Sequence, residues 1–393
     1  MSEKTLELRD LPNEMQQLLV EKCDLISRCR LRAVSTGMKE LVSATKLFIP
    51  AVRIKQLPSG GIFVKLTIKL FKDEYSLKFK RNESGGTRIC QSFRNDVIIE
   101  DSDPIDEAVA WFKTMCLQKN VSIGIFAIET SDKAESIVQK FGELIQSTDY
   151  PLKIKSLRVD GSGAADLMWK FMERCDVNEF KELRVTPTET TEPFVLFGKQ
   201  DAIIKGLEKI EIDCDSIITD DVASLGASVL YLKSENATED MVDRLIEKFV
   251  KKREAGSAFC IQNLKNKVFG DTLPAGFSFV NSSYHDYKEY ENCIENQPTI
   301  YLRVSADSVR LEVGRNTLYR FWTNNGDVGL IPRPIEFDDL DSDDDFYDCF
   351  DDIEDEVSWS QYEYEDENDI LDAGGFSDFD SDVDDDLDIS EYY

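Results

Sequence analysis

The stretch Lys155-Ser156-Leu157-Arg158-Val159 decides the fold class, because a close variant, Lys181-Glu182-Leu183-Arg184-Val185, follows it 26 residues later. Both stretches place apolar side chains at alternate positions, as half-buried strands do. Glu208-Lys209-Ile210-Glu211-Ile212 repeats the pattern after another 27 residues, and Gly124–Ile128 precedes the first stretch by 31. Val229–Leu232 gives a weaker fifth strand, 20 residues further on. Since helical patterns lie between these strands, we predict an α/β fold.

The spacing also indicates a repeat. Units of 26 and 27 residues fall inside the range of leucine-rich repeats, roughly 20–29 residues, in which one strand and its connection stack on the next unit. We therefore predict a degenerate leucine-rich-repeat-like α/β region over residues 101–332. The helical pattern between the strands is carried by Ala108, Val109, Phe112 and Met115 after Pro104, by Ile137, Val138, Phe141, Leu144 and Ile145 after an Asp132/Glu135 capping box, by Leu167, Phe171 and Met172, and by Met241, Leu245, Ile246 and Phe249 after a Thr238 cap.

Strict alternation marks a separate segment, residues 50–100. Apolar residues occupy every second position from Ile62 to Leu70 and again from Tyr75 to Phe79. We predict a β-hairpin with its turn at Lys72-Asp73-Glu74, closed by Gly85-Gly86, which connects the two larger parts of the chain. The α/β region ends in a second hairpin, with strands 300–304 and 309–313.

The N-terminal segment, residues 5–46, predicts three short helices. The first follows Leu11-Pro12, the second begins near Ser27, and Ser35 is the expected N-cap of the third. So small a helical bundle buries little apolar surface, and it leaves apolar side chains exposed unless a partner covers them. We therefore expect a docking module.

Charge is concentrated at the other end of the chain. The net charge is −31. The 58 residues from Glu336 to Tyr393 contain 27 acidic residues and no Lys or Arg, so the preceding residues carry a net charge of only −4. Pro332 and Pro334 mark the boundary, and we predict that residues 333–393 form a disordered acidic tail. An almost neutral body with an anionic tail repels phosphate backbones, so we expect no nucleic-acid binding.

Composition also bounds the compartment. No apolar run approaches the roughly 20 residues that a membrane helix needs, and the start Met1-Ser2-Glu3-Lys4 lacks the apolar core of a signal peptide. Nine cysteines are scattered singly, without the close pairs of a disulfide framework. We expect a protein of the cytoplasm, the nucleus or both, with no membrane partner.

Sequence signals for catalysis are weak. His285 is the single histidine, and it lies in a polar, loop-like stretch. No Cys-x-x-Cys pair or nucleotide-binding glycine motif is present, and Gly161-Ser162-Gly163 is better interpreted as a turn. We expect no catalytic residue, no metal site and no cofactor. The tail offers possible phosphorylation sites for acidophilic kinases at Ser342, Ser377 and Ser381.

The N-terminal segment resembles the F-box. Leu11-Pro12-Asn13-Glu14-Met15 and the block Arg30–Ser35 follow the family pattern without a gap over about 35 residues, with Met38 where Trp is usual and Arg28 in a commonly aliphatic position. The resemblance implies binding to a Skp-type adaptor and, through it, to a cullin. The positions that match the family pattern are Leu11, Pro12, Met15, Leu19, Leu25, Leu31 and Val34.

The downstream region resembles, more loosely, the FTH domain that often follows the F-box in nematode proteins. The resemblance implies a non-catalytic substrate receptor of a Skp-cullin-F-box ubiquitin ligase, which binds a protein target through residues 101–332. An alternative is a non-ligase interaction protein whose acidic, aromatic tail binds basic proteins. Residues inside the F-box can pack its own helices or contact the adaptor, and the pattern alone does not separate the two roles.

Overall fold

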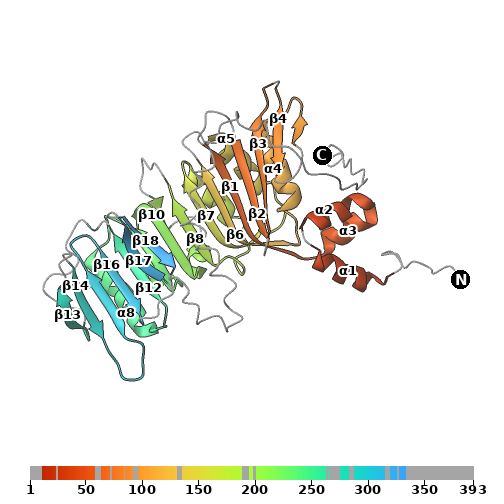
Figure 1. Cartoon of the computed structure of the whole chain (residues 1–393). Helices are drawn as coiled ribbons and strands as arrows, with labels where there is room; N and C mark the ends of the chain where they lie inside the picture. The colour runs from red at the N-terminus through yellow and green to blue at the C-terminus, as the bar shows by residue number, and fades with distance from the viewer. Residues whose placement is uncertain are drawn as a thin grey trace, which may run out of the picture. The chain divides into compact units, whose positions relative to one another are not determined.

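The computed structural model describes residues 11–23, 25–57, 63–70, 73–83, 85–91, 96–130, 135–187, 194–197, 201–262, 264, 275–282, 287–314, 319–324 and 327–332. Nearly all of the described residues belong to one compact unit, residues 1–330 (Figure 1). The predicted disordered tail, its three serines and His285 lie outside the described residues.

Three short helices form the N-terminal part of this unit, as predicted (Figure 1): α1 (Asn13–Lys22), α2 (Leu25–Val34) and α3 (Thr36–Ala44). Pro12 is the N-cap of α1, where its missing N–H costs no intrahelical hydrogen bond. The Ser35 hydroxyl accepts a hydrogen bond from the Met38 N–H, which confirms the predicted cap of α3. The second helix begins at Leu25, two residues before the predicted start.

A large mixed sheet with a parallel centre forms the rest of this unit. All five predicted strands are present: β6 (Val121–Thr130), β7 (Lys153–Gly161), β8 (Glu182–Thr186), β10 (Lys209–Ile217) and β11 (Val229–Lys233). They pair in parallel in this order, and two strands that the sequence did not reveal extend the parallel series, β1 (Leu47–Leu57) beside β6 and β12 (Ala258–Gln262) beside β11.

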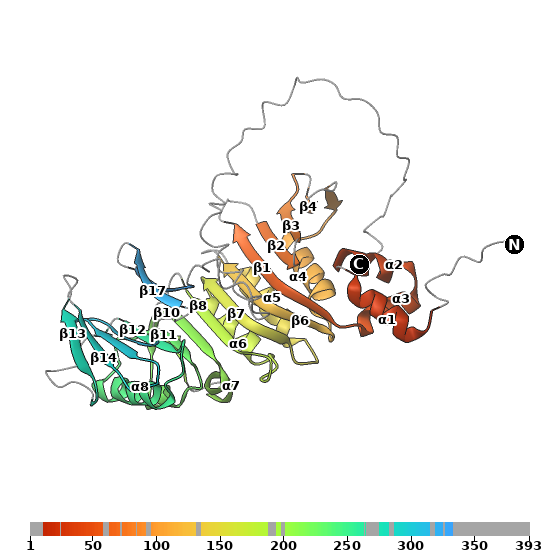
Figure 2. The same ribbon diagram turned by 60° about the horizontal axis from the view of Figure 1, so that its bottom comes forward.

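Helices cover one face of this parallel centre (Figure 2). They are α4 (Pro104–Met115), α5 (Glu135–Gln146), α6 (Ala164–Met172) and α8 (Glu239–Lys252); a short helix α7 (Asp201–Gly206) and a 3₁₀ turn η2 (Asp220–Ser224) occupy two other connections. One rung of the sheet shows the packing. Phe126, Leu157, Leu183, Ile210, Leu230 and Phe259 lie side by side on adjacent strands and are all buried. Phe126 packs against Phe112 of α4 and Phe171 of α6, with ring centroids 5.2 and 4.9 Å away.

Antiparallel strands flank the parallel centre on both sides. Beside β1 lie β2 (Phe63–Leu70), β3 (Asp73–Arg81), β4 (Thr87–Gln91) and β5 (Val97–Ile99); beside β12 lie β16 (Val309–Val313), β15 (Ile300–Val304), β14 (Lys288–Asn292) and β13 (Ser278–Ser282). Both predicted hairpins are therefore present, as β2–β3 and β15–β16. The predicted turn of the first hairpin at Lys72-Asp73-Glu74 is wrong, because Asp73 and Glu74 pair with Leu70 and Lys69 and so belong to β3. The first belongs to the same sheet as the α/β region, since β1 pairs with both β2 and β6.

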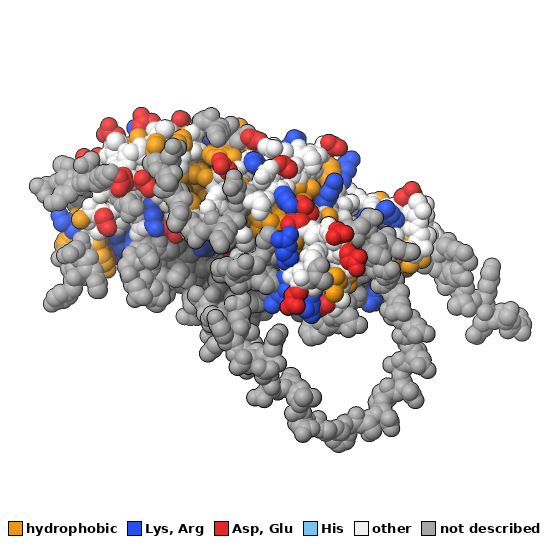
Figure 3. Space-filling model, turned by 90° about the horizontal axis from the view of Figure 1, so that it is seen from above, with side chains coloured by type: hydrophobic (Ala, Val, Ile, Leu, Met, Phe, Trp, Pro, Cys, Tyr) orange, Lys and Arg blue, Asp and Glu red, His pale blue; other side chains and the backbone are white. Residues whose placement is uncertain are grey.

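Three minor strands complete the described part. β9 (Phe194–Val195) pairs with β10, and β17 (Tyr319–Asn324) and β18 (Asp327–Pro332) pair with each other. No helix among the described residues is long and apolar enough to cross a membrane. On the face drawn in Figure 3, basic and acidic side chains are interspersed, as the near balance of charge outside the tail predicts.

Candidate functional site

Helix α1 presents apolar side chains to solvent. Met15, Leu18 and Leu19 are 50%, 58% and 48% exposed, whereas Val20 is fully buried. Residues three and four positions apart lie on one side of a helix, so these three side chains form a continuous apolar strip, here called the α1 face. An exposed apolar strip of this kind on a protein surface indicates a site that a protein partner covers.

The remaining residues matched to the F-box pattern lie in different environments. Leu11 and Leu31 are half-buried, Pro12 is exposed, and Val34 is 71% exposed at the end of α2. The side chain of Leu25 lies outside the described part. The structure thus brings Met15 and Leu19 together on α1, and it adds Leu18, which the family pattern missed. Its helical spacing from Met15 was the available signal.

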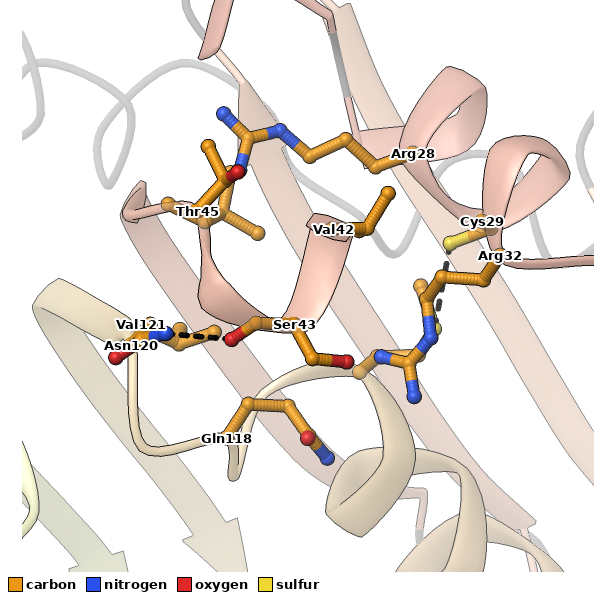
Figure 4. Close-up of a pocket in the computed structure, with 11 residues that line it drawn as sticks. Arg28, Cys29, Arg32, Val42, Ser43, Thr45, Gln118, Asn120 and Val121 are labelled. Atoms are coloured by element: carbon orange, nitrogen blue, oxygen red, sulfur yellow. Dashed lines mark hydrogen bonds between the residues drawn. The ribbon is translucent and has the colours of Figure 1, made fainter. Parts of the chain in front are cut away.

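Arg28 ties these helices to the sheet. Its side chain is only 4% exposed, and it donates hydrogen bonds to the carbonyl oxygens of Glu21 (3.2 Å), Cys23 (3.0 Å) and Lys46 (2.8 Å). The first two carbonyls lie at the C-terminal end of α1, and the third directly precedes β1. Figure 4 shows the guanidinium beside Thr45. An arginine at a commonly aliphatic position therefore has a structural role, because it supplies donors for three carbonyl groups of the main chain.

A seam of contacts holds the helices against the α/β part. The Cys29 sulfur of α2 lies 3.5 Å from the Met115 sulfur of α4, and the Asn120 amide donates to the Ser43 carbonyl. Between them lies a cavity of about 30 Å³, drawn in Figure 4. Ligand pockets measure roughly 300–1,000 Å³, so this cavity is too small for a metabolite. The seam holds α2 and α3 against the α/β part, and its cavity has no room for a metabolite.

Several buried thiols are poor nucleophiles. Burial raises the pKa of Cys175, Cys214 and Cys260 to about 12, so these thiols stay protonated at neutral pH. Among the described residues no three His, Cys, Asp or Glu side chains cluster as a metal site would require. The α1 face is therefore the candidate functional site.

Comparisons with known proteins bear only on the three N-terminal helices. Neither the curated proteins nor the solved structures contain a match to this chain. Residues 8–50 match the family model of the F-box domain, so the three N-terminal helices that present the α1 face belong to an F-box domain.

Proposed function

We propose that this chain is a substrate receptor of a Skp-cullin-F-box ubiquitin ligase, which binds the adaptor through the α1 face. The observation that carries the proposal is the exposure of Met15, Leu18 and Leu19 within the F-box domain. Burying one such side chain contributes about 1.5–3 kcal/mol, and these three are already about half covered. Complete covering of the strip therefore supplies several kcal/mol, enough for the centre of a protein interface.

The rest of the chain serves, in this proposal, to bind a target protein. The mechanism is proximity: a target held on the α/β part is presented to the ubiquitin carrier that the cullin recruits, and the chain contributes no catalytic group. The contacts of Arg28 and Cys29 support this role, because they fix the F-box helices against the sheet that would carry the target. The proposal places the protein in the cytoplasm or the nucleus.

The finer assignments belong to the same proposal. They are an F-box over residues 5–46, a connecting hairpin segment over 50–100, an FTH or leucine-rich-repeat-like target-binding domain over 101–332 and a disordered tail over 333–393, in a protein of nematode type. The parallel strands with helices on one face support the repeat-like domain. The alternative, a tail that binds basic proteins, concerns residues outside the described part.

Capture of a recombinant Skp-type adaptor tests the proposal. The wild-type chain is expected to retain the adaptor, and Leu18→Glu/Leu19→Glu is expected to weaken binding about 100-fold or more, because two apolar anchors become charged. Both side chains are about half exposed, so the variant should keep the wild-type melting temperature.

The matched control is Gln17→Glu, an exposed residue of α1 outside the apolar strip. It should bind the adaptor within about twofold of wild type, as expected for a surface substitution away from the interface. Failure of the wild-type chain to bind the adaptor, or equal binding by the double variant, would refute the proposal.

A further inference from the structure

The two faces of the sheet differ in chemistry. Helices cover one face, and the other carries charged side chains in register across neighbouring strands. Arg158 of β7 lies beside Arg184 of β8, which lies beside Glu211 of β10. Over this central part the charges are mixed and paired: Arg184 Nε lies 3.7 Å from a Glu211 carboxylate oxygen, and Lys233 forms an ion pair with Asp213.

Strands β1 to β4 depart from this balance. Residues 47–91 contain nine basic and three acidic residues, a net charge of +6, whereas the other residues of the segment 1–335 carry −10. The positive charge of the body is thus concentrated in the segment that contains these four adjacent strands. Such a local excess produces a potential that attracts anions over a distance of about 8–10 Å at physiological salt.

The basic side chains of these strands lie on the helix-free face. Val52, Ile54, Leu77, Phe79 and Ile89 are buried, and the residues that alternate with them point to the opposite side. These alternating basic residues are Arg53, Lys55, Lys78, Lys80 and Arg88, each exposed or half-exposed. We call this set the basic face.

The register sets like charges opposite each other at three positions of these strands, and opposite charges, Lys69 and Glu74, at one. Lys55 of β1 pairs with Lys65 of β2, Lys65 pairs with Lys78 of β3, and Lys80 pairs with Arg88 of β4. Like charges at directly opposed positions of antiparallel strands destabilise a sheet. An anionic partner placed over the strands would offset this cost.

Among the residues that the structure describes, two carboxylates form ion pairs with the basic face. Glu129 pairs with both Arg53 and Lys55, and Asp96 pairs with Arg88. Asp96 also interacts electrostatically with Lys80, although the ion pairs found among the described residues of this face include neither Lys78 nor Lys80. Lys78 is thus the basic residue of this face with the least internal compensation, and Lys80 shares Asp96 with Arg88.

We propose that the basic face binds an acidic segment of a partner polypeptide, which in the receptor proposal above is the target. This extends the target-binding surface from residues 101–332 to the segment 50–100, whose strands belong to the same sheet. An extended acidic segment places carboxylates along its length, and the neighbouring strands present basic residues about 4.8 Å apart, so several charges can pair at once. A long nucleic acid fits less well, since it would extend beyond the basic face onto surface that carries net negative charge.

The test measures binding of a labelled poly-glutamate peptide of about 20 residues to the full-length chain. Binding is expected at physiological salt and should weaken steeply at 0.5 M salt, since screening acts on exposed charges. Lys78→Glu/Lys80→Glu is expected to reduce affinity at least about tenfold, and Lys78→Gln/Lys80→Gln by a smaller factor, because reversal adds repulsion to the lost attraction. The control Lys251→Glu/Lys288→Glu changes two exposed lysines elsewhere and should bind as wild type does.

Adaptor capture in the same variants separates this proposal from the receptor proposal. The Lys78/Lys80 variants should retain the adaptor, and Leu18→Glu/Leu19→Glu should retain the peptide. Equal peptide binding by the Lys78/Lys80 and Lys251/Lys288 charge-reversal variants would overturn the basic face as the site. If a single-stranded oligonucleotide bound more tightly than the poly-glutamate peptide, an acidic polypeptide would be ruled out as the preferred partner. Peptide binding by a chain ending at Pro334 but not by the full-length chain would assign the basic face to the acidic residues 336–393 in place of a partner.

Discussion

Arg28 offers the sharpest test of how single residues support the docking helices. Replacing it with Met removes donors from the carbonyls of Glu21, Cys23 and Lys46 while keeping an apolar stem of similar length. Hydrogen bonds from a charged donor contribute more than neutral ones, so Arg28→Met is expected to lower the free energy of unfolding by about 3 kcal/mol. Urea denaturation measures the change. Arg30→Met on the same helix alters an exposed residue and should cost less than about 0.5 kcal/mol; an equal loss in both variants would contradict the role of Arg28.

A second single residue, Lys248, should make the unfolding free energy depend on pH. Its ammonium donates to the carbonyls of Leu225 and Ala227, and burial, with a smaller effect of Lys252, lowers its pKa to about 8 from 10.5. Between these values the unfolded chain holds the proton and the folded chain has released it, so stability rises with pH through this window. The unfolding free energy of the wild type minus that of Lys248→Met should therefore be more positive at pH 9.5 than at pH 7. A difference that stays constant would show that Lys248 titrates normally in the folded chain.

At the scale of elements, the N-cap of α4 couples two helices. Asp103 Oδ1 accepts from the N–H groups of Ile105 (3.0 Å) and Asp106 (3.2 Å), and it lies 3.0 Å from Lys140 Nζ of α5. Asp103→Ala should lower the unfolding free energy by about 1–2 kcal/mol. Asp103→Asn keeps the cap, and Lys140 keeps its second ion pair with Asp106, so its cost should be less than half. Thermal and urea denaturation check the order, and equal losses would mean that the ion pair outweighs the cap.

Elements that depend on neighbours in sequence could be predicted, and those that depend on distant neighbours could not. Ser35 and Thr238 were predicted as helix caps because a cap binds N–H groups two or three residues away. Strand β1 was missed because Pro50 interrupts it. The structure accommodates Pro50 through Gly124 of β6, where a Cβ atom would lie 2.5 Å from the Pro50 carbonyl oxygen. That match joins residues more than 70 positions apart.

In the candidate site, too, some residues could be predicted from the sequence and others could not. Met15 and Leu19 were predicted from the F-box pattern, and helical spacing could have added Leu18. The anchoring role of Arg28 could not be predicted, since its acceptor at Lys46 lies 18 residues away across a turn of the chain. The basic face could not be predicted either, because it depends on the register that brings Lys55, Lys65 and Lys78 together.

At the scale of the whole compact unit, the buried core runs without a break from Ile49 of β1 to Val313 of β16. Leu183 of β8 lies near the middle of the parallel strands and is buried. Leu183→Ala should therefore lower the unfolding free energy by about 2–5 kcal/mol. Because one core joins both sides, amide-exchange protection should fall in β6 and in β11 alike.

Val177→Ala is the matched control, since it truncates an apolar side chain that is 59% exposed, and it should leave exchange near the wild-type level. Hydrogen exchange followed by mass spectrometry of peptides covering Val121–Thr130 and Val229–Lys233 makes the measurement. In a repeat array each unit contacts only its neighbours. If the units were weakly coupled, the loss of exchange protection caused by Leu183→Ala would be confined to one side of β8. Protection lost on one side alone would mean that the strands fold as semi-independent repeats.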